Sequence, residues 1–107
     1  MLYLAWTTVP EKDDAARLAT ECVSRGLAAC AQIDGPITSV FVWKGQVETT
    51  PEYRLHLKCL PENLNALEAY VLGNHPYQTP EWIVVETERV SQKYLSWART
   101  DTNHRPL

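Results

Sequence analysis

The feature that most constrains the fold is a long central β-hairpin, predicted over residues 30–59. The segment ITSVFVW sends successive side chains to alternate faces, and Lys44-Gly45 fits a two-residue hairpin turn. The return strand separates apolar from polar side chains: Tyr53, Leu55, Leu57 and Cys59 against Glu52, Arg54, His56 and Lys58. Two short helices cannot cover so long a hairpin, and its far half still carries Phe41, Val42 and Trp43. Because exposed apolar strands pair with other chains, we predict an oligomer whose hairpins pair between subunits.

Three more β-rich segments are predicted outside the far half of the hairpin, at residues 2–9, 27–33 and 82–88. The second of them overlaps the start of the hairpin. Asp-Gly-Pro at 34–36 predicts a bend where the second of these segments meets the hairpin. Pro51 cannot donate to a β-ladder, so it predicts a bulge or an edge in the return strand.

The helices are predicted from apolar spacing and from their terminal residues. A first helix is expected after Glu11, with Gly26 at its C′ position. A second helix runs from Pro61 to Gly73, and Ser91 is the N-cap of a last one. The resulting order, βαββαβ plus a terminal helix, is the ferredoxin-like α+β fold. We expect one domain over residues 1–100 and a polar tail at 101–107.

Composition excludes several classes of function. The formal net charge is -3 and no run of Lys or Arg occurs, so a nucleic-acid partner is not expected. No stretch approaches the ~18 apolar residues that a membrane span requires, and the N-terminus lacks the charged region of a signal peptide. The three cysteines form no CxxC pair, which favours a reducing compartment, and we predict a cytoplasmic protein.

The stretch NHPYQTPEWI (74–83) holds the first group of candidate site residues. Its two prolines predict a rigid corner between a helix and a strand. His75 either bonds to a nearby carbonyl or serves as one imidazole ligand of Cu(II) or another divalent ion. A single histidine makes a weak site, so a second ligand from a neighbouring chain would be needed, with Glu81, Glu48 or Cys30 as candidates.

The remaining candidates each have a structural and a functional interpretation. Cys22 and Cys59 are predicted core residues, whereas Cys30 is either core or a thiol in a cleft. Four aromatic residues either pack at a subunit interface or stack on a ligand: Trp43, Tyr77, Trp82 and Trp97. Lys58 is either solvated or directed at an anion, and His56 and His104 are assigned to solvent.

Four segments resemble the CutA family of divalent-cation tolerance proteins: GLAACAQI (26–33), SVFVWKGQVE (39–48), HPYQTPE (75–81) and YLSW (94–97). The resemblance implies a ferredoxin-like homotrimer, built like the PII signalling proteins, with clefts between subunits. It also implies a link to tolerance of copper and other divalent metals, and in animal relatives to the anchoring of acetylcholinesterase. Some members place a cysteine near Thr7 and a second histidine at the position of Asn74, and threonine is commoner where Cys59 stands. A Cys/His copper site carried over whole would therefore lack ligands here.

No catalytic motif is present: the sequence has no GxSxG, P-loop, HExxH or GxGxxG pattern, so an enzyme is not expected. The predicted function is divalent metal (copper) tolerance, with weak binding in inter-subunit clefts. The predicted metal ligands are His75, Cys30 and Glu81, and the predicted cleft residues are Trp43, Glu48, Lys58, Tyr77 and Trp97. The alternative is a PII-like small-ligand sensor or protein-assembly module without a metal function.

Overall fold

The computed structural model describes residues 1–103 and has the predicted order of elements. These are β1 (Tyr3–Val9), α1 (Lys12–Ser24), β2 (Cys30–Trp43), β3 (Gln46–Cys59), the 3-10 turn η1 (Pro61–Asn63), α2 (Leu64–Gly73), β4 (Ile83–Glu86) and α3 (Gln92–Asn103). The ferredoxin-like βαββαβ order with a terminal helix is confirmed.

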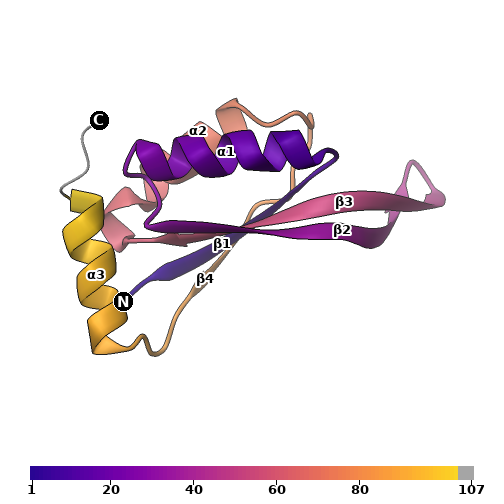
Figure 1. Cartoon of the computed structure of the whole chain (residues 1–107). Helices are drawn as coiled ribbons and strands as arrows, with labels where there is room; N and C mark the ends of the chain where they lie inside the picture. The colour runs from indigo at the N-terminus through magenta and orange to yellow at the C-terminus, as the bar shows by residue number, and fades with distance from the viewer. Residues whose placement is uncertain (104–107) are drawn as a thin grey trace.

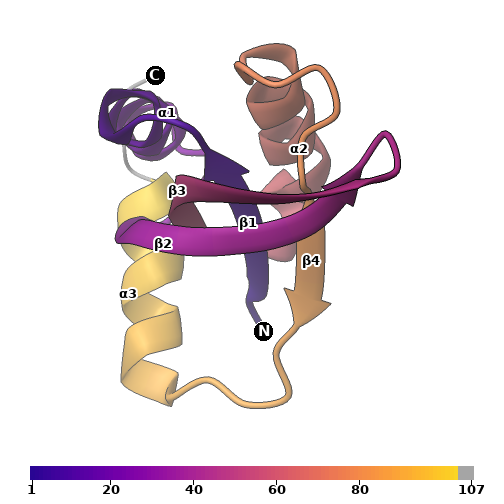
Figure 2. The same ribbon diagram turned by 90° about the vertical axis from the view of Figure 1, so that its right-hand side faces the viewer.

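The four strands form one antiparallel sheet in the order β2-β3-β1-β4. Helices α1 and α2 cover one face, and α3 lies at one end of the sheet and extends to the opposite side (Figures 1 and 2). Within residues 1–103, no other helix covers the sheet face away from α1 and α2.

The core lies between the sheet and the helices α1 and α2. Helix α1 buries the predicted stripe of Ala15, Leu18 and Cys22, and Leu55, Leu57 and Cys59 of β3 pack in the same cluster. Gly26 adopts a φ of 73°, the left-handed conformation expected of a residue that follows a helix. Cys22 and Cys59 are fully buried free thiols, as predicted.

The hairpin is continuous, and the predicted bend is a bulge inside it. β2 starts at Cys30, three residues later than expected, and pairs with β3 throughout apart from a register shift between Asp34 and Ile37. Lys44 and Gly45 have positive φ values of 50° and 78°, which is the geometry of a type I′ turn. Pro51 lies in the part of β3 that β1 does not reach, so the predicted edge position is confirmed.

The far half of the hairpin projects beyond the rest of the molecule (Figure 1). The radius of gyration is 14.6 Å, whereas a compact domain of this length would have about 13 Å. The projecting strands leave Val40, Val42 and Val47 between 64% and 73% exposed. The apolar residues that sequence reasoning found uncovered are therefore uncovered by this chain's own helices.

The ends of β4 and α3 also differ from those predicted. β4 has four residues instead of seven. At the next pair of the ladder the Thr87 amide still donates to the Leu2 carbonyl, but the Leu2 amide donates to the Thr87 hydroxyl instead of to a backbone carbonyl, and the chain then turns toward α3. α3 continues to Asn103 and so includes the first three residues of the predicted polar tail. The rest of the predicted tail, including His104, lies outside the described residues. Within residues 1–103 the helices are too short or too polar to span a bilayer.

Candidate functional site

A groove of about 700 Å³ lies alongside the projecting hairpin. Its walls come from β2, β3, the end of β1 and the connection between α2 and β4, which descends beside the hairpin (Figures 1 and 2). The lining residues are Thr8, Ser39, Val40, Phe41, Trp43, Glu48, Thr50, Glu52, Tyr77, Gln78, Thr79 and Glu81. Four of the predicted site residues, Trp43, Glu48, Tyr77 and Glu81, therefore share one groove.

His75 lies behind the groove wall and is held on both sides of its ring. Its Nδ1 atom accepts the Tyr77 amide at 3.1 Å, so the proton is on Nε2, which lies 2.8 Å from the Thr7 hydroxyl oxygen. The Thr7 hydroxyl in turn donates to the Glu81 carbonyl at 2.7 Å. Burial lowers the pKa of His75 and favours the neutral ring. Of the two interpretations of His75, the structure supports the histidine bonded within its own chain.

Tyr77 turns its hydroxyl toward a carboxylate inside the groove wall. The hydroxyl donates to Oε2 of Glu52 at 2.7 Å, and Glu52 is only 7% exposed. Burial, followed by this bond to the carboxylate, raises the pKa of Tyr77, so its hydroxyl keeps its proton. Glu52 was grouped with the polar side chains of β3, but here it is buried and contributes to the groove.

The groove is acidic. Three carboxylates, those of Glu48, Glu52 and Glu81, line it, and no Lys, Arg or His is among its lining residues. Two of the three, Glu48 and Glu81, belong to exposed residues, and the third is oriented by Tyr77. Such an arrangement attracts cations and disfavours anions.

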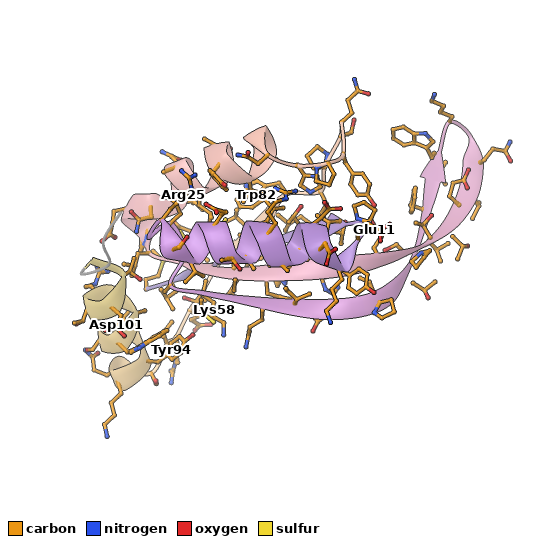
Figure 3. All side chains as sticks on the ribbon, turned by 45° about the horizontal axis from the view of Figure 1, so that its top comes forward. Glu11, Arg25, Lys58, Trp82, Tyr94 and Asp101 are labelled. Atoms are coloured by element: carbon orange, nitrogen blue, oxygen red, sulfur yellow. The ribbon has the colours of Figure 1, made fainter. Side chains whose placement is uncertain are left out.

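The other three predicted residues, Cys30, Lys58 and Trp97, lie away from the groove. Cys30 pairs with Lys58 in the sheet, and Lys58 alternates with the buried Leu57 and Cys59, so both point to the face opposite α1 and α2. The Lys58 ammonium lies 5.5 Å above the Tyr94 ring, which packs 5.4 Å from the ring of Trp97. Figure 3 shows Lys58 and Tyr94 together beside α3, at the end of the molecule away from the hairpin tip.

Sequence reasoning missed a hydrogen-bonded row across three strands of the open sheet face. The Trp6 indole donates to Nδ1 of His56 at 2.6 Å, and Nε2 of His56 lies 2.7 Å from the carboxylate of Asp34. A guanidinium nitrogen of Arg54 is 3.8 Å from the same carboxylate oxygen. His56 was assigned to solvent, and that assignment is wrong. Trp6 and His56 are direct partners in the β1–β3 register, which strand alternation alone could not reveal.

The sequence and the fold are similar to those of known proteins. The sequence profile of the CutA1 divalent ion tolerance protein family matches residues 3–101. The chain is 38% identical over 99 residues to "Protein CutA 1, chloroplastic" of Oryza sativa, covering 92% of this chain and 56% of the rice protein. It is 35% identical over 102 residues to the probable divalent-cation tolerance protein cutA homolog of Encephalitozoon cuniculi, covering 92% and 89%. The crystal structure of divalent ion tolerance protein CutA1 from Ehrlichia chaffeensis matches with a TM-score of 0.91, at 30% identity and 94% coverage of both chains.

The fold and the groove define an α+β protein of ferredoxin-like topology that extends one hairpin beyond its body. The chain belongs to the CutA1 divalent ion tolerance protein family, as its sequence motifs predicted. It spans about half the length of the rice protein and of "Protein CutA, chloroplastic" of Arabidopsis thaliana, 56% in each case.

The family name implies a divalent ion, which requires several ligand atoms around one point. Within residues 1–103 no three His, Cys, Asp or Glu side chains gather closely enough to hold a metal. His75 has both ring nitrogens engaged, and Cys30 lies on the far face of the sheet. The predicted set of His75, Cys30 and Glu81 is therefore not brought together within one chain. The groove instead offers carboxylate oxygens, the ligands that suit hard divalent cations.

Proposed function

We propose that this protein is a homotrimer that binds divalent cations weakly in its grooves and thereby contributes to divalent-cation tolerance. The observation that carries the proposal is that three carboxylates line one groove whose described lining residues include no cation. Glu48 and Glu81 would supply ligands, and Glu52, oriented by the Tyr77 hydroxyl, would add negative charge behind them. A neighbouring subunit would complete the coordination shell.

The proposed binding is weak because each chain supplies few ligands. For calcium sites, a small number of charged ligands and a flexible site give dissociation constants on the order of 10⁻⁴ to 10⁻³ M, and the same dependence on ligand charge is expected here. Among first-row divalent ions, Cu(II) would bind most tightly, because it has the highest affinity in the general series for sites with nitrogen and oxygen ligands. Weak sites would buffer a cation in excess without competing for trace metal.

The trimer is supported by the exposed apolar side chains of the projecting hairpin. Val40, Val42 and Val47 are more than 60% exposed, and Phe41 and Trp43 are 41% and 51% exposed. Burying a valine or phenylalanine side chain contributes about 1.5–3 kcal/mol. Three hairpins that each cover a neighbour's far half would bury this surface and close the grooves between subunits, in the manner of the PII proteins.

The alternative function is a PII-like small-ligand sensor or protein-assembly module. The exposed hairpin residues favour the assembly form of this alternative, because they offer a partner an apolar surface. An anion site at Lys58 is less well supported, since that ammonium already lies over the Tyr94 ring and outside the groove.

We further propose a non-enzymatic protein of the cytoplasm. Burial raises the thiol pKa of Cys22 and of Cys59 to about 12, so neither supplies a thiolate nucleophile at neutral pH. All three cysteines are free thiols, which suits a reducing compartment. Cell fractionation followed by immunoblotting tests the compartment. The name of the rice relative, which is called chloroplastic, indicates that members of the family differ in compartment.

The proposed function is tested by calorimetric titration of Cu(II) into the reduced protein, with a weak chelator present to suppress stray surface binding. We expect a saturable event that Glu81→Gln and Glu48→Gln each weaken about tenfold, equivalent to roughly 1.4 kcal/mol. Glu88→Gln is the matched control, because Glu88 is exposed and does not line the groove. Flat heats, or binding that survives the Glu48/Glu81 double substitution, would rule out a carboxylate site in the groove.

A further inference from the structure

We infer that His75 and Thr7 are positioning residues for the groove: together they fix loop 74–82 so that Tyr77 and Glu81 face into it, and neither binds the cation. The inference deepens the proposed function, because it treats the groove as the binding site. It rests on the hydrogen-bond chain that links Tyr77, His75, Thr7 and Glu81.

The donors and acceptors of these hydrogen bonds follow one consistent direction. The Tyr77 amide donates to Nδ1 of His75, the protonated Nε2 donates to the Thr7 hydroxyl, and that hydroxyl donates to the Glu81 carbonyl. Every polar atom of the His75 ring and of the Thr7 side chain is used. No ring nitrogen retains a free lone pair for a metal, because one accepts a bond and the other carries the proton.

Thr7, the residue that anchors this row of hydrogen bonds, is held rigidly. Thr7 is fully buried, and its backbone is fixed by pairing with Leu55 of β3, immediately beyond the stretch that β4 covers. Loop 74–82 is attached to this one threonine near its start, through His75, and near its end, through the Glu81 carbonyl. Tyr77 and Glu81, two of the groove's lining residues, are therefore positioned by a side chain that does not itself line the groove.

The orientation of the buried Glu52 carboxylate depends on the same row of hydrogen bonds. Tyr77 reaches Glu52 only because its backbone is held against the His75 ring, whose centroid lies 5.4 Å from that of the tyrosine. Releasing loop 74–82 would remove the hydroxyl from Glu52 and shift Glu81 at once. Loss of His75 would then weaken cation binding although no ligand had been removed.

The discriminating variants are at Thr7, which has no ligand role to lose. We expect Thr7→Val, which keeps the shape and removes the hydroxyl, to weaken Cu(II) binding in the groove about tenfold, to the same degree as His75→Ala. Thr7→Ser restores the hydroxyl and should bind within about twofold of the unaltered protein. Thr20→Val, on the exposed surface of α1, is the matched control. A Thr7→Val variant with unchanged affinity beside a defective His75→Ala variant would overturn the inference and make His75 a ligand.

A second measurement keeps the inference testable if no cation binds. Long-range ¹H–¹⁵N spectra of the unaltered protein should show His75 as the neutral tautomer protonated on Nε2, with its nitrogen shifts unchanged on adding the diamagnetic ion Zn²⁺. Amide exchange of Tyr77 should accelerate in Thr7→Val and return to normal in Thr7→Ser. These results without cation binding would support the positioning role and refute the proposed function. An Nδ1-protonated ring, or ring shifts that saturate with Zn²⁺, would refute the positioning role.

Discussion

At the scale of the residue, burial of the neutral His75 ring makes stability depend on pH. Its pKa is lowered from the ordinary value of about 6.5, mainly by burial. The protonated ring is favoured by the Thr8 backbone and by the charges of Asp14 and Glu52, and it is opposed by Arg17. Between the two pKa values the unfolded chain binds more protons than the folded one, so folding stability falls as the pH falls.

We therefore predict that the free energy of unfolding is highest above about pH 6.5 and declines below it until the folded-state pKa is passed. Urea denaturation at intervals from pH 8 to pH 5 would show this decline, and His75→Gln should reduce its slope because glutamine does not titrate. Parallel pH profiles for the two proteins would mean that His75 is not responsible for the acid-side loss.

Single residues also show how far the candidate site could be predicted. Trp43, Glu48, Tyr77 and Glu81 were named from motifs and do share the groove. Cys30 lies outside this groove, because its face depends on the β2–β3 register, a long-range pairing that no local pattern records. Thr7 and Glu52 are buried polar residues whose partners come from a loop about 70 and 25 residues further along the chain.

At the scale of the element, the bulge in β2 depends on Gly35. Its φ of +152° lies in a region that L side chains rarely adopt, and a Cβ added there would lie 2.3 Å from Cδ2 of Tyr53. The aromatic ring packs where a side chain would otherwise stand. Gly35 thus allows β2 to pass from the body of the sheet into the projecting hairpin while Tyr53 covers the bulge.

We predict that Gly35→Ala destabilises the protein by about 1–3 kcal/mol, the usual cost of a strained backbone position, with more if the Tyr53 ring cannot move. Gly73→Ala is the matched control, because no atom lies within 4 Å of its added Cβ and its φ is not positive. Urea denaturation of the two variants and the unaltered protein measures the difference. Equal stability of the two variants would show that the bulge tolerates a side chain.

The elements themselves differ in how well sequence predicts them. The limits of α1 follow from local signals, an apolar stripe and Gly26, and they were predicted to within a residue. β2 was divided at Asp-Gly-Pro because these residues favour turns, whereas pairing with β3 keeps the strand continuous around a bulge. β4 ends early because the Thr87 hydroxyl, and not a backbone carbonyl, accepts the amide of Leu2 near the opposite end of the chain, which is likewise a long-range effect.

At the scale of the whole molecule, the chain extends 46 Å along its longest axis against 22 Å along its shortest. The body, formed by the sheet with α1 and α2, has its own buried core, whereas the far half of the hairpin has only its two strands. An isolated two-stranded hairpin is marginally stable in water. The projecting half therefore gains most of its order from whatever covers it, which the proposed trimer supplies.

The exposed face of the hairpin leads to a prediction for the oligomeric state. Val42 and Val47 are direct partners across the hairpin, so they share one face, and both are largely exposed in the single chain. Replacing both with aspartate would place two carboxylates per subunit in the proposed interface, and an unpaired buried charge costs several kcal/mol. We expect the mass in light scattering to fall from three times the chain mass of 12.2 kDa to that of one chain.

The matched control for that experiment is Lys44→Asp, an exposed position in the hairpin turn and outside the paired strands. It should leave the trimer intact, because it does not share the face formed by Val42 and Val47. Circular dichroism of the double variant should show a folded body, since its core residues are remote from the substituted tip. A trimer that survives Val42→Asp/Val47→Asp would mean that the subunits associate through the open sheet face instead. A single-chain mass already in the unaltered protein would refute the trimer, and with it the completion of the cation site by a neighbour.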